Sequence, residues 1–183
     1  RAIVQGVTAW AFAVRLAALI AVHFIVGPYS FAGDATFYET VGLGLAEHWQ
    51  GLRPAPRQVV GPLPSYFHVN AILYLLVGES GFAASVMNMF FGFWTVLLTY
   101  SISRTLLGVR YAKWAALITA SFPSLILRSI LNIRDAIATF LVTAIVFLGI
   151  RLSRRPHLRG LILLGAAFLA LQEEPCGNLP DLQ

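Results

Sequence analysis

Long apolar runs separated by short polar turns dominate the chain. A helix rises about 1.5 Å per residue, so about 20 apolar residues cross the hydrocarbon core of a bilayer. The pattern therefore predicts an all-α fold, a polytopic membrane helix bundle with about five transmembrane helices. The predicted spans cover residues 7–27, 82–107, 114–131, 136–152 and 160–171.

The longest polar stretch follows the first span and predicts a loop over residues 28–81. Apolar residues recur at four-residue steps from Phe37 to Trp49, and this spacing predicts a helix over residues 35–49. The apolar run 65–78 is too short to cross, and such runs are typical of interfacial or re-entrant helices. The loop is therefore expected to carry two interfacial helices.

Residues 1–171 form one predicted transmembrane domain, and residues 172–183 depart from its pattern. The first span lacks a following small-residue cleavage site, so it is interpreted as a retained anchor. The tail carries two glutamates and two prolines. A truncated end, an altered reading frame and a true short tail are all open interpretations of it.

Composition supports a membrane protein and excludes several other classes. Hydrophobic residues make up 58% of the chain, charged residues 11%, and the mean hydropathy is +0.75. Soluble domains carry about 45–50% apolar and about 25% charged residues. The net charge of +5 comes from basic residues between apolar runs, which does not indicate a nucleic-acid partner. The single cysteine excludes an internal disulfide, and the glycine-loop, nucleophile-elbow and zinc-protease motifs of soluble enzymes are lacking.

The distribution of basic residues predicts the orientation in a cell membrane, which the composition suggests is a bacterial inner membrane. With a cytoplasmic N-terminus, the turns after the second and fourth spans face the cytoplasm, and the loop 28–81 is extracytoplasmic. Those two turns carry basic residues and no acidic residue, as short cytoplasmic loops do. The basic residues are Arg104, Arg110, Lys113, Arg151, Arg154, Arg155 and Arg159.

Asp34 is the first candidate for chemistry, because it stands just beyond the first span and directly before a predicted helix. A carboxylate there can accept a proton from a hydroxyl or bind a metal. It also fits a helix N-cap, which contributes about 1 kcal/mol. Glu39 follows about one helical turn later, and two carboxylates can hold a divalent cation. Two acids alone do not define a metal site, so the cofactor stays unknown, with a divalent cation as an open alternative.

Arg128, Arg134 and Asp135 cluster between the third and fourth spans. Charges near a bilayer are candidates for function, and a guanidinium pairs well with phosphate. The alternative is that the acid favours the dipole of the helix it begins and that the arginines snorkel to the interface. Arg15 and His23 lie within the first span and are expected to face the bundle interior and pair with neighbours.

Aromatic residues are frequent in the loop region and around the first interfacial helix. They fit an interfacial belt, and stacking against a sugar is the alternative. They are Tyr29, Phe31, Phe37, Tyr38, Trp49, Tyr66 and Phe67.

Three short motifs follow one another in a recognisable order over roughly residues 1–171. They are Gly33-Asp34-Ala35-x-x-Tyr38 after the first span, Gly61-Pro62-Leu63-Pro64 leading to a helix that ends at Gly78, and Phe122-Pro123-Ser124 leading to Asn132-Ile133-Arg134-Asp135. This layout resembles the N-terminal part of the GT-C class of membrane glycosyltransferases. Within that class it is most similar to the protein mannosyltransferase and aminoarabinose transferase group.

The resemblance implies a glycosyltransferase that moves a sugar from a polyprenyl-phosphate donor to an acceptor on the extracytoplasmic face. Asp34 would act as general base on the acceptor hydroxyl, with Tyr38 and Glu39 nearby in the substrate site. Arg128 and Arg134 would bind the carrier phosphate and stabilise it as it leaves. Asp135 would orient those arginines or assist a metal.

Two other functions remain open at this point. A transporter or flippase fragment for lipid-linked sugars needs ionisable residues at mid-bilayer on several helices, and only Arg15, His23 and the Pro123 region qualify. A non-catalytic membrane assembly subunit predicts that Asp34 and Asp135 are dispensable.

Overall fold

The computed structural model describes residues 2–27, 33–54, 56, 65–154 and 158–171, and every regular element within them is a helix. This confirms the predicted all-α membrane helix bundle. The elements in chain order are α1 (Ala2–Ala21), the π-helical turn η1 (Val22–Val26), α2 (Gly33–Trp49), α3 (Ser65–Val77), α4 (Gly81–Leu107), α5 (Val109–Ser121), α6 (Pro123–Ile130), α7 (Asp135–Arg154) and α8 (Leu158–Leu171).

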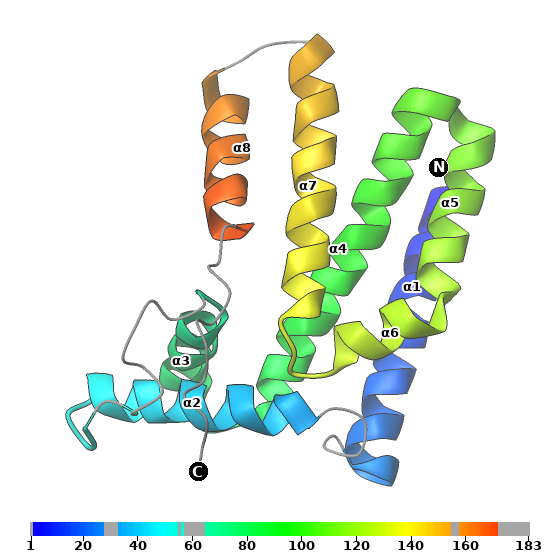
Figure 1. The fold of residues 1–183 in the computed structure, drawn as a ribbon. Helices are drawn as coiled ribbons and strands as arrows, with labels where there is room; N and C mark the ends of the chain where they lie inside the picture. Colours follow the sequence, from blue (N-terminus) through cyan, green and yellow to red (C-terminus); the bar gives the residue numbers. More distant parts are fainter. Residues whose placement is uncertain (1, 28–32, 55, 57–64, 155–157, 172–183) are drawn as a thin grey trace, which may run out of the picture.

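The long helices run along a common axis, and α2 lies across one end of them (Figure 1). Helix α4 packs between α5 and α7, α1 lies against α4 and α5, and α8 lies beside α7. The α6 helix and the turn after it lie at the same end of the bundle as α2 and α3. Segments far apart in sequence therefore meet at one end.

Three of the described helices are long and apolar enough to cross a membrane, namely Gln5–Val26, Gly81–Leu107 and Asp135–Arg154. Two shorter apolar helices accompany them, at Ser65–Val77 and Gly160–Leu169.

The predicted span over residues 114–131 is not one helix. Helix α5 begins earlier, at Val109, and ends at Ser121; Phe122 is extended with a ψ of 115°, and α6 starts at Pro123. Proline has no N–H to donate to the carbonyl four residues earlier, and its ring disfavours a helical conformation at the residue before it. The chain therefore turns at Phe122 and runs sideways through α6 (Figure 1).

Small residues let several helices approach one another closely. Ala11, Val96, Ala116 and Ala120 form one buried cluster where α1, α4 and α5 meet. Lipid supplies no hydrophobic force between helices, so their association depends on van der Waals packing. Small residues favour this packing because they let the helix backbones come close together.

Helix α2 packs against α3 with similar closeness. A Cβ atom on Gly42 would lie 2.8 Å from the Cβ of Asn70, so this contact needs a glycine. Helix α2 begins at Gly33, which places Asp34 inside its first turn. The interpretation of Asp34 as the cap residue before the helix was therefore wrong, because the helix starts one residue before Asp34.

Apart from the buried Arg15, the charged side chains named below lie at one end of the bundle or the other. The end formed by the last turn of α4, the first two turns of α5 and the last turn of α7 carries Arg104, Arg110, Lys113, Arg151 and Arg154. We call it the basic end. The opposite end, where α2 lies and α4 and α7 begin, carries Asp34, Glu39, Glu47, Glu79 and Asp135 together with Arg53, Arg128 and Arg134. We call it the acidic end.

Candidate functional site

The turn between α6 and α7 is fixed to α3 by the buried amide of Asn132. Its Oδ1 accepts hydrogen bonds from the Tyr66 hydroxyl at 2.6 Å and from Asn70 Nδ2 at 3.2 Å, and its Nδ2 donates to the Tyr74 hydroxyl at 3.3 Å. Burial raises the pKa of Tyr66 well above its usual value, so the hydroxyl stays protonated and remains a donor.

Asn88 of α4 holds the same turn from the other side. Its Nδ2 lies 2.6 Å from the Leu131 carbonyl oxygen, 2.9 Å from the Ile133 carbonyl oxygen and 2.9 Å from the Tyr66 hydroxyl. Asn88 is fully buried. A buried hydrogen bond contributes about 1 kcal/mol net, and leaving one partner unsatisfied costs about 1–3 kcal/mol. The residues that follow this turn are thus held in a defined place.

Arg128 and Asp135 form an ion pair across the fixed turn. Arg128 Nη1 lies 2.9 Å from Asp135 Oδ2, and the two side chains are 58% and 45% exposed. Asp135 begins α7, where a carboxylate also interacts favourably with the helix dipole. An exposed pair of this kind contributes at most about 1 kcal/mol, so it opens at little cost.

Arg15 of α1 is buried, with 1% of its surface exposed, and its guanidinium bonds to backbone carbonyls instead of a carboxylate. Nη1 lies 3.2 Å from the Ala11 oxygen and 3.3 Å from the Ala120 oxygen, and Nη2 lies 3.4 Å from the Thr119 oxygen. The carbonyls of Thr119 and Ala120 lack helical partners because α5 ends at Ser121. Arg15 thus caps α5 inside the bundle, which agrees with the expectation that it faces the interior.

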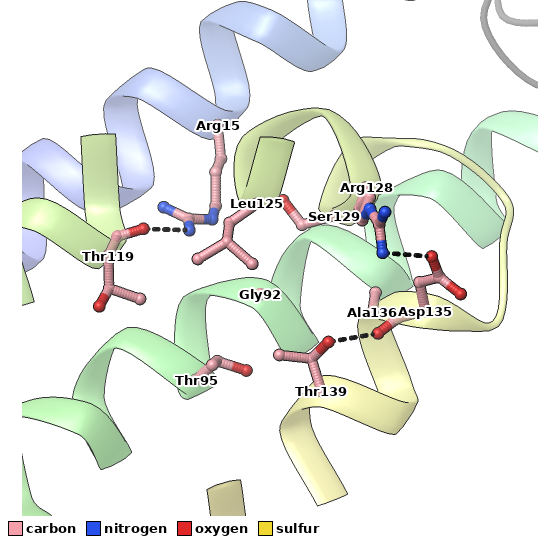
Figure 2. Close-up of a pocket in the computed structure, with 10 residues that line it drawn as sticks. All are labelled: Arg15, Gly92, Thr95, Thr119, Leu125, Arg128, Ser129, Asp135, Ala136 and Thr139. Carbon is pink, nitrogen blue, oxygen red and sulfur yellow. Dashed lines mark hydrogen bonds and ion pairs between the residues drawn. The ribbon is translucent and has the colours of Figure 1, made fainter. Parts of the chain in front are cut away.

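A small cavity lies between Arg15 and the ion pair (Figure 2). Its volume is about 20 Å³, enough for one water molecule. Arg15 Nε is buried and has no hydrogen-bond partner among the described residues. The lining residues are Arg15, Gly92, Thr95, Thr119, Leu125, Arg128, Ser129, Asp135, Ala136 and Thr139.

The remaining predicted site residues lie on α2. Asp34 is exposed in its first turn. Tyr38, one turn later, packs edge-to-face on Tyr66 with ring centroids 5.0 Å apart. The Glu39 carboxylate lies beside the start of α4, since a Cβ atom on Gly81 would be 2.7 Å from its Oε1.

The structure brings some predicted residues together and leaves others apart. Arg128 and Asp135 share an ion pair and a cavity, and Arg134 is exposed on the turn between their helices. Asp34 is at the same end of the bundle, but it is not among the described residues that line the cavity. Within the described part of the chain, no group of three or more His, Cys, Asp or Glu side chains forms a metal site.

Sequence reasoning missed the amides that hold the turn. Asn70 and Asn88 are single amides inside otherwise apolar runs, and a lone polar residue in such a run usually bonds to a neighbouring helix. That signal was available in the sequence, whereas their partners on the α6–α7 turn, the Asn132 side chain for Asn70 and the Leu131 and Ile133 carbonyls for Asn88, could not be inferred without the fold.

The fold and the site define an integral membrane helix bundle with an arginine–carboxylate pair held at one end. Residues 60–171 match the model of the family described as dolichyl-phosphate-mannose-protein mannosyltransferase, and the chain belongs to this family. Membership confirms the predicted resemblance to the protein mannosyltransferase group and the assignment to membrane glycosyltransferases. No curated protein and no solved structure matches the chain. The matched range includes Arg128, Arg134 and Asp135, and it begins after Asp34.

Proposed function

We propose that this chain contributes to a site where a sugar passes from a polyprenyl-phosphate carrier to an acceptor on the extracytoplasmic face. The observation that carries the proposal is the Arg128–Asp135 pair, which is exposed but spans a turn that buried amides hold. Such a turn presents a guanidinium in a fixed position next to the membrane.

Arg128 is suited to the carrier phosphate. A guanidinium binds phosphate through two parallel hydrogen bonds, and its exposed contact with Asp135 is weak enough to be exchanged for that anion. When the sugar leaves, the electron pair of the broken C–O bond stays on the carrier phosphate. Arg128 at the end of α6, and Arg134 on the turn that follows, would stabilise that charge, while Asp135 would orient Arg128.

Asp34 is suited to act on the acceptor. It would take the proton of the acceptor hydroxyl while the hydroxyl oxygen forms a bond to the anomeric carbon of the sugar. Its exposed position at the acidic end supports this role, because α2 and the α6–α7 turn lie at the same end (Figure 1). Tyr38 and Glu39 follow on the same helix and would contact the substrates.

The distribution of charge supports an extracytoplasmic acidic end. Basic residues with no acidic partner gather at the opposite end of the described structure, as they do on cytoplasmic faces. The lipid-linked donor would then reach Arg128 from the outer leaflet.

The proposal is tested by measuring release of polyprenyl phosphate from polyprenyl-phosphate mannose by the full-length protein in proteoliposomes. Arg128→Gln is expected to lower turnover about 100-fold, and Asp34→Asn by about 100-fold or more. The control replaces another ion pair at the same end, Glu47→Gln with Arg53→Gln, whose partners lie 3.1 Å apart, with Arg53 exposed and Glu47 partly buried. The control should keep turnover near that of the wild type.

The outcomes separate the parts of the proposal. Unchanged turnover in Asp34→Asn would discard the general base, and unchanged turnover in Arg128→Gln would discard the phosphate contact. If both variants match the control, the acidic end is not the site of transfer.

Transport of lipid-linked sugars is a second candidate, favoured by one observation. Broken helices beside buried charges are typical of transporters, and α5 breaks at Phe122 beside Arg15. Movement of a lipid-linked sugar across the bilayer without release of polyprenyl phosphate would support transport over transfer.

A further inference from the structure

A second groove lies at the basic end of the bundle, far from the site described above. It runs between α1 and the first turns of α5 and has a volume of about 580 Å³. Figure 1 shows this region beside the N-terminus, opposite the end where α2 lies. The groove is lined by Val7, Val109, Arg110, Lys113, Trp114 and Leu117.

The lining changes from cationic to apolar along one face of α5. Arg110, Lys113, Trp114 and Leu117 are spaced by three and four residues, which places them on the same side of a helix. Of these four residues, the two cations lie nearest the start of α5, Trp114 is 61% exposed, and Leu117 is half-buried and lies furthest along the helix. Val7 of α1 forms the opposite wall.

The two cations have no acidic partner in the described part of the chain. The ion pairs found there, Arg53–Glu47 and Arg128–Asp135, are both at the acidic end. Arg154 at the basic end is engaged differently, because it donates a hydrogen bond of 3.0 Å to the Thr105 carbonyl oxygen. Arg110 and Lys113 therefore present unneutralised charge to whatever fills the groove.

We propose that this groove binds an anionic phospholipid. Its phosphate would lie between Arg110 and Lys113, its glycerol region beside the amphipathic ring of Trp114, and the start of an acyl chain along Leu117 and Val7. Basic pockets between transmembrane helices bind anionic headgroups in this way, and tryptophan favours the headgroup level. The inference does not depend on the proposed glycosyl transfer, because it uses other residues at the other end of the bundle.

The charge and the apolar depth together favour a phospholipid over a soluble anion. A free phosphate would use the two cations but leave Trp114, Leu117 and Val7 without a role. A zwitterionic phospholipid would fill the apolar part but gain little from Arg110 and Lys113.

The test places the full chain in nanodiscs and follows quenching of Trp114 fluorescence by lipids with brominated acyl chains. Trp10, Trp49 and Trp94 are replaced by phenylalanine, so that Trp114 alone reports. Brominated phosphatidylglycerol is compared with brominated phosphatidylcholine at equal mole fraction. One basic residue near a lipid phosphate favours an anionic headgroup about fivefold, so we expect a preference of at least that size for phosphatidylglycerol.

The preference should disappear in Arg110→Gln with Lys113→Gln. The matched control is Arg104→Gln with Arg151→Gln, which removes the same charge from the same end outside this groove and should keep the preference. Equal loss in both double variants would overturn the inference, because it would mean that only surface charge matters.

Two further results bear on the proposal. Phosphatidylglycerol should raise the thermal midpoint of the wild-type chain, with its native tryptophans, and should not raise that of the Arg110→Gln, Lys113→Gln variant. Displacement of the brominated lipid by stoichiometric polyprenyl phosphate would overturn the assignment to a phospholipid. So would equal quenching by the two brominated lipids in the parent chain.

Discussion

At the scale of single residues, buried amides do most to define the site. Asn132 connects to three side chains of α3, and Asn88 bonds to the backbone on both sides of it. A polar group that is buried without a partner is costly. Losing one of these bonds therefore destabilises the protein mainly through the unpaired group that remains. The exposed Arg128–Asp135 pair is the opposite case, being weak and exchangeable.

Asn132→Ala is therefore expected to destabilise the protein by about 1–3 kcal/mol, because it leaves the Tyr66 hydroxyl and the Asn70 amide without this partner. Tyr66→Phe should cost less, about 1 kcal/mol, since Asn132 keeps its bond from Asn70 and Asn88 keeps both carbonyls. Denaturant unfolding in detergent measures both. A larger loss for Tyr66→Phe would contradict this account of the network.

At the scale of elements, the break between α5 and α6 and the close contact of α4 with α6 shape the bundle. Proline at position 123 and the spacing of apolar residues were readable from the sequence, as were most helix positions. The hydrogen bonds from Arg15 to the freed carbonyls were not, because they come from a helix more than a hundred positions away. Tertiary hydrogen bonds of that kind leave no local pattern.

Arg15→Leu should destabilise the protein by about 1–3 kcal/mol, because the Thr119 and Ala120 carbonyls lose their donors. In a Pro123→Ala background the same change should cost less, since the restored amide at position 123 can bond to the Thr119 carbonyl. The double-mutant cycle measures this coupling through unfolding free energies. Additive effects would show that Arg15 does not stabilise the break between α5 and α6.

Gly92→Ala tests the packing of α4 against α6. A Cβ atom on Gly92 would clash with the Cβ of Ser129, so the variant should unfold at a lower temperature than the wild type. Gly149→Ala is the control on α7, where nothing lies within 4 Å of the added atom, and it should be neutral or slightly stabilising. Equal effects of the two changes would show that α4 and α6 can separate without cost.

At the scale of the whole molecule, charge and architecture divide the chain into two ends. The sequence alone predicted that division through the positions of its basic turns, and it placed Asp34 and Arg128 on the same side. It did not reveal that Tyr38 of α2 packs on Tyr66 of α3, or that Tyr66 bonds to Asn132 on the α6–α7 turn, because both contacts join segments far apart in the chain. The sequence pattern indicates which helix faces are apolar and which ends are charged, whereas distances between residues on different helices depend on how the helices pack.

Cysteine labelling of a Cys176→Ser chain in intact cells tests the orientation. Gln50→Cys lies at the acidic end and Tyr111→Cys at the basic end, and both side chains are exposed. A membrane-impermeant maleimide added outside should label the first and spare the second until the membrane is opened. The reverse pattern would place the acidic end in the cytoplasm.

The anchoring of the α6–α7 turn on α3 has a consequence for engineering. Helix α3 supplies no reacting group in the proposed chemistry, yet it touches α2 through Gly42 and the turn through Asn132. Any chimera that exchanges the segment after the first helix with that of another family member would have to exchange the turn as well. The two segments form one structural unit, although about fifty residues separate α3 from Asn132 in the chain.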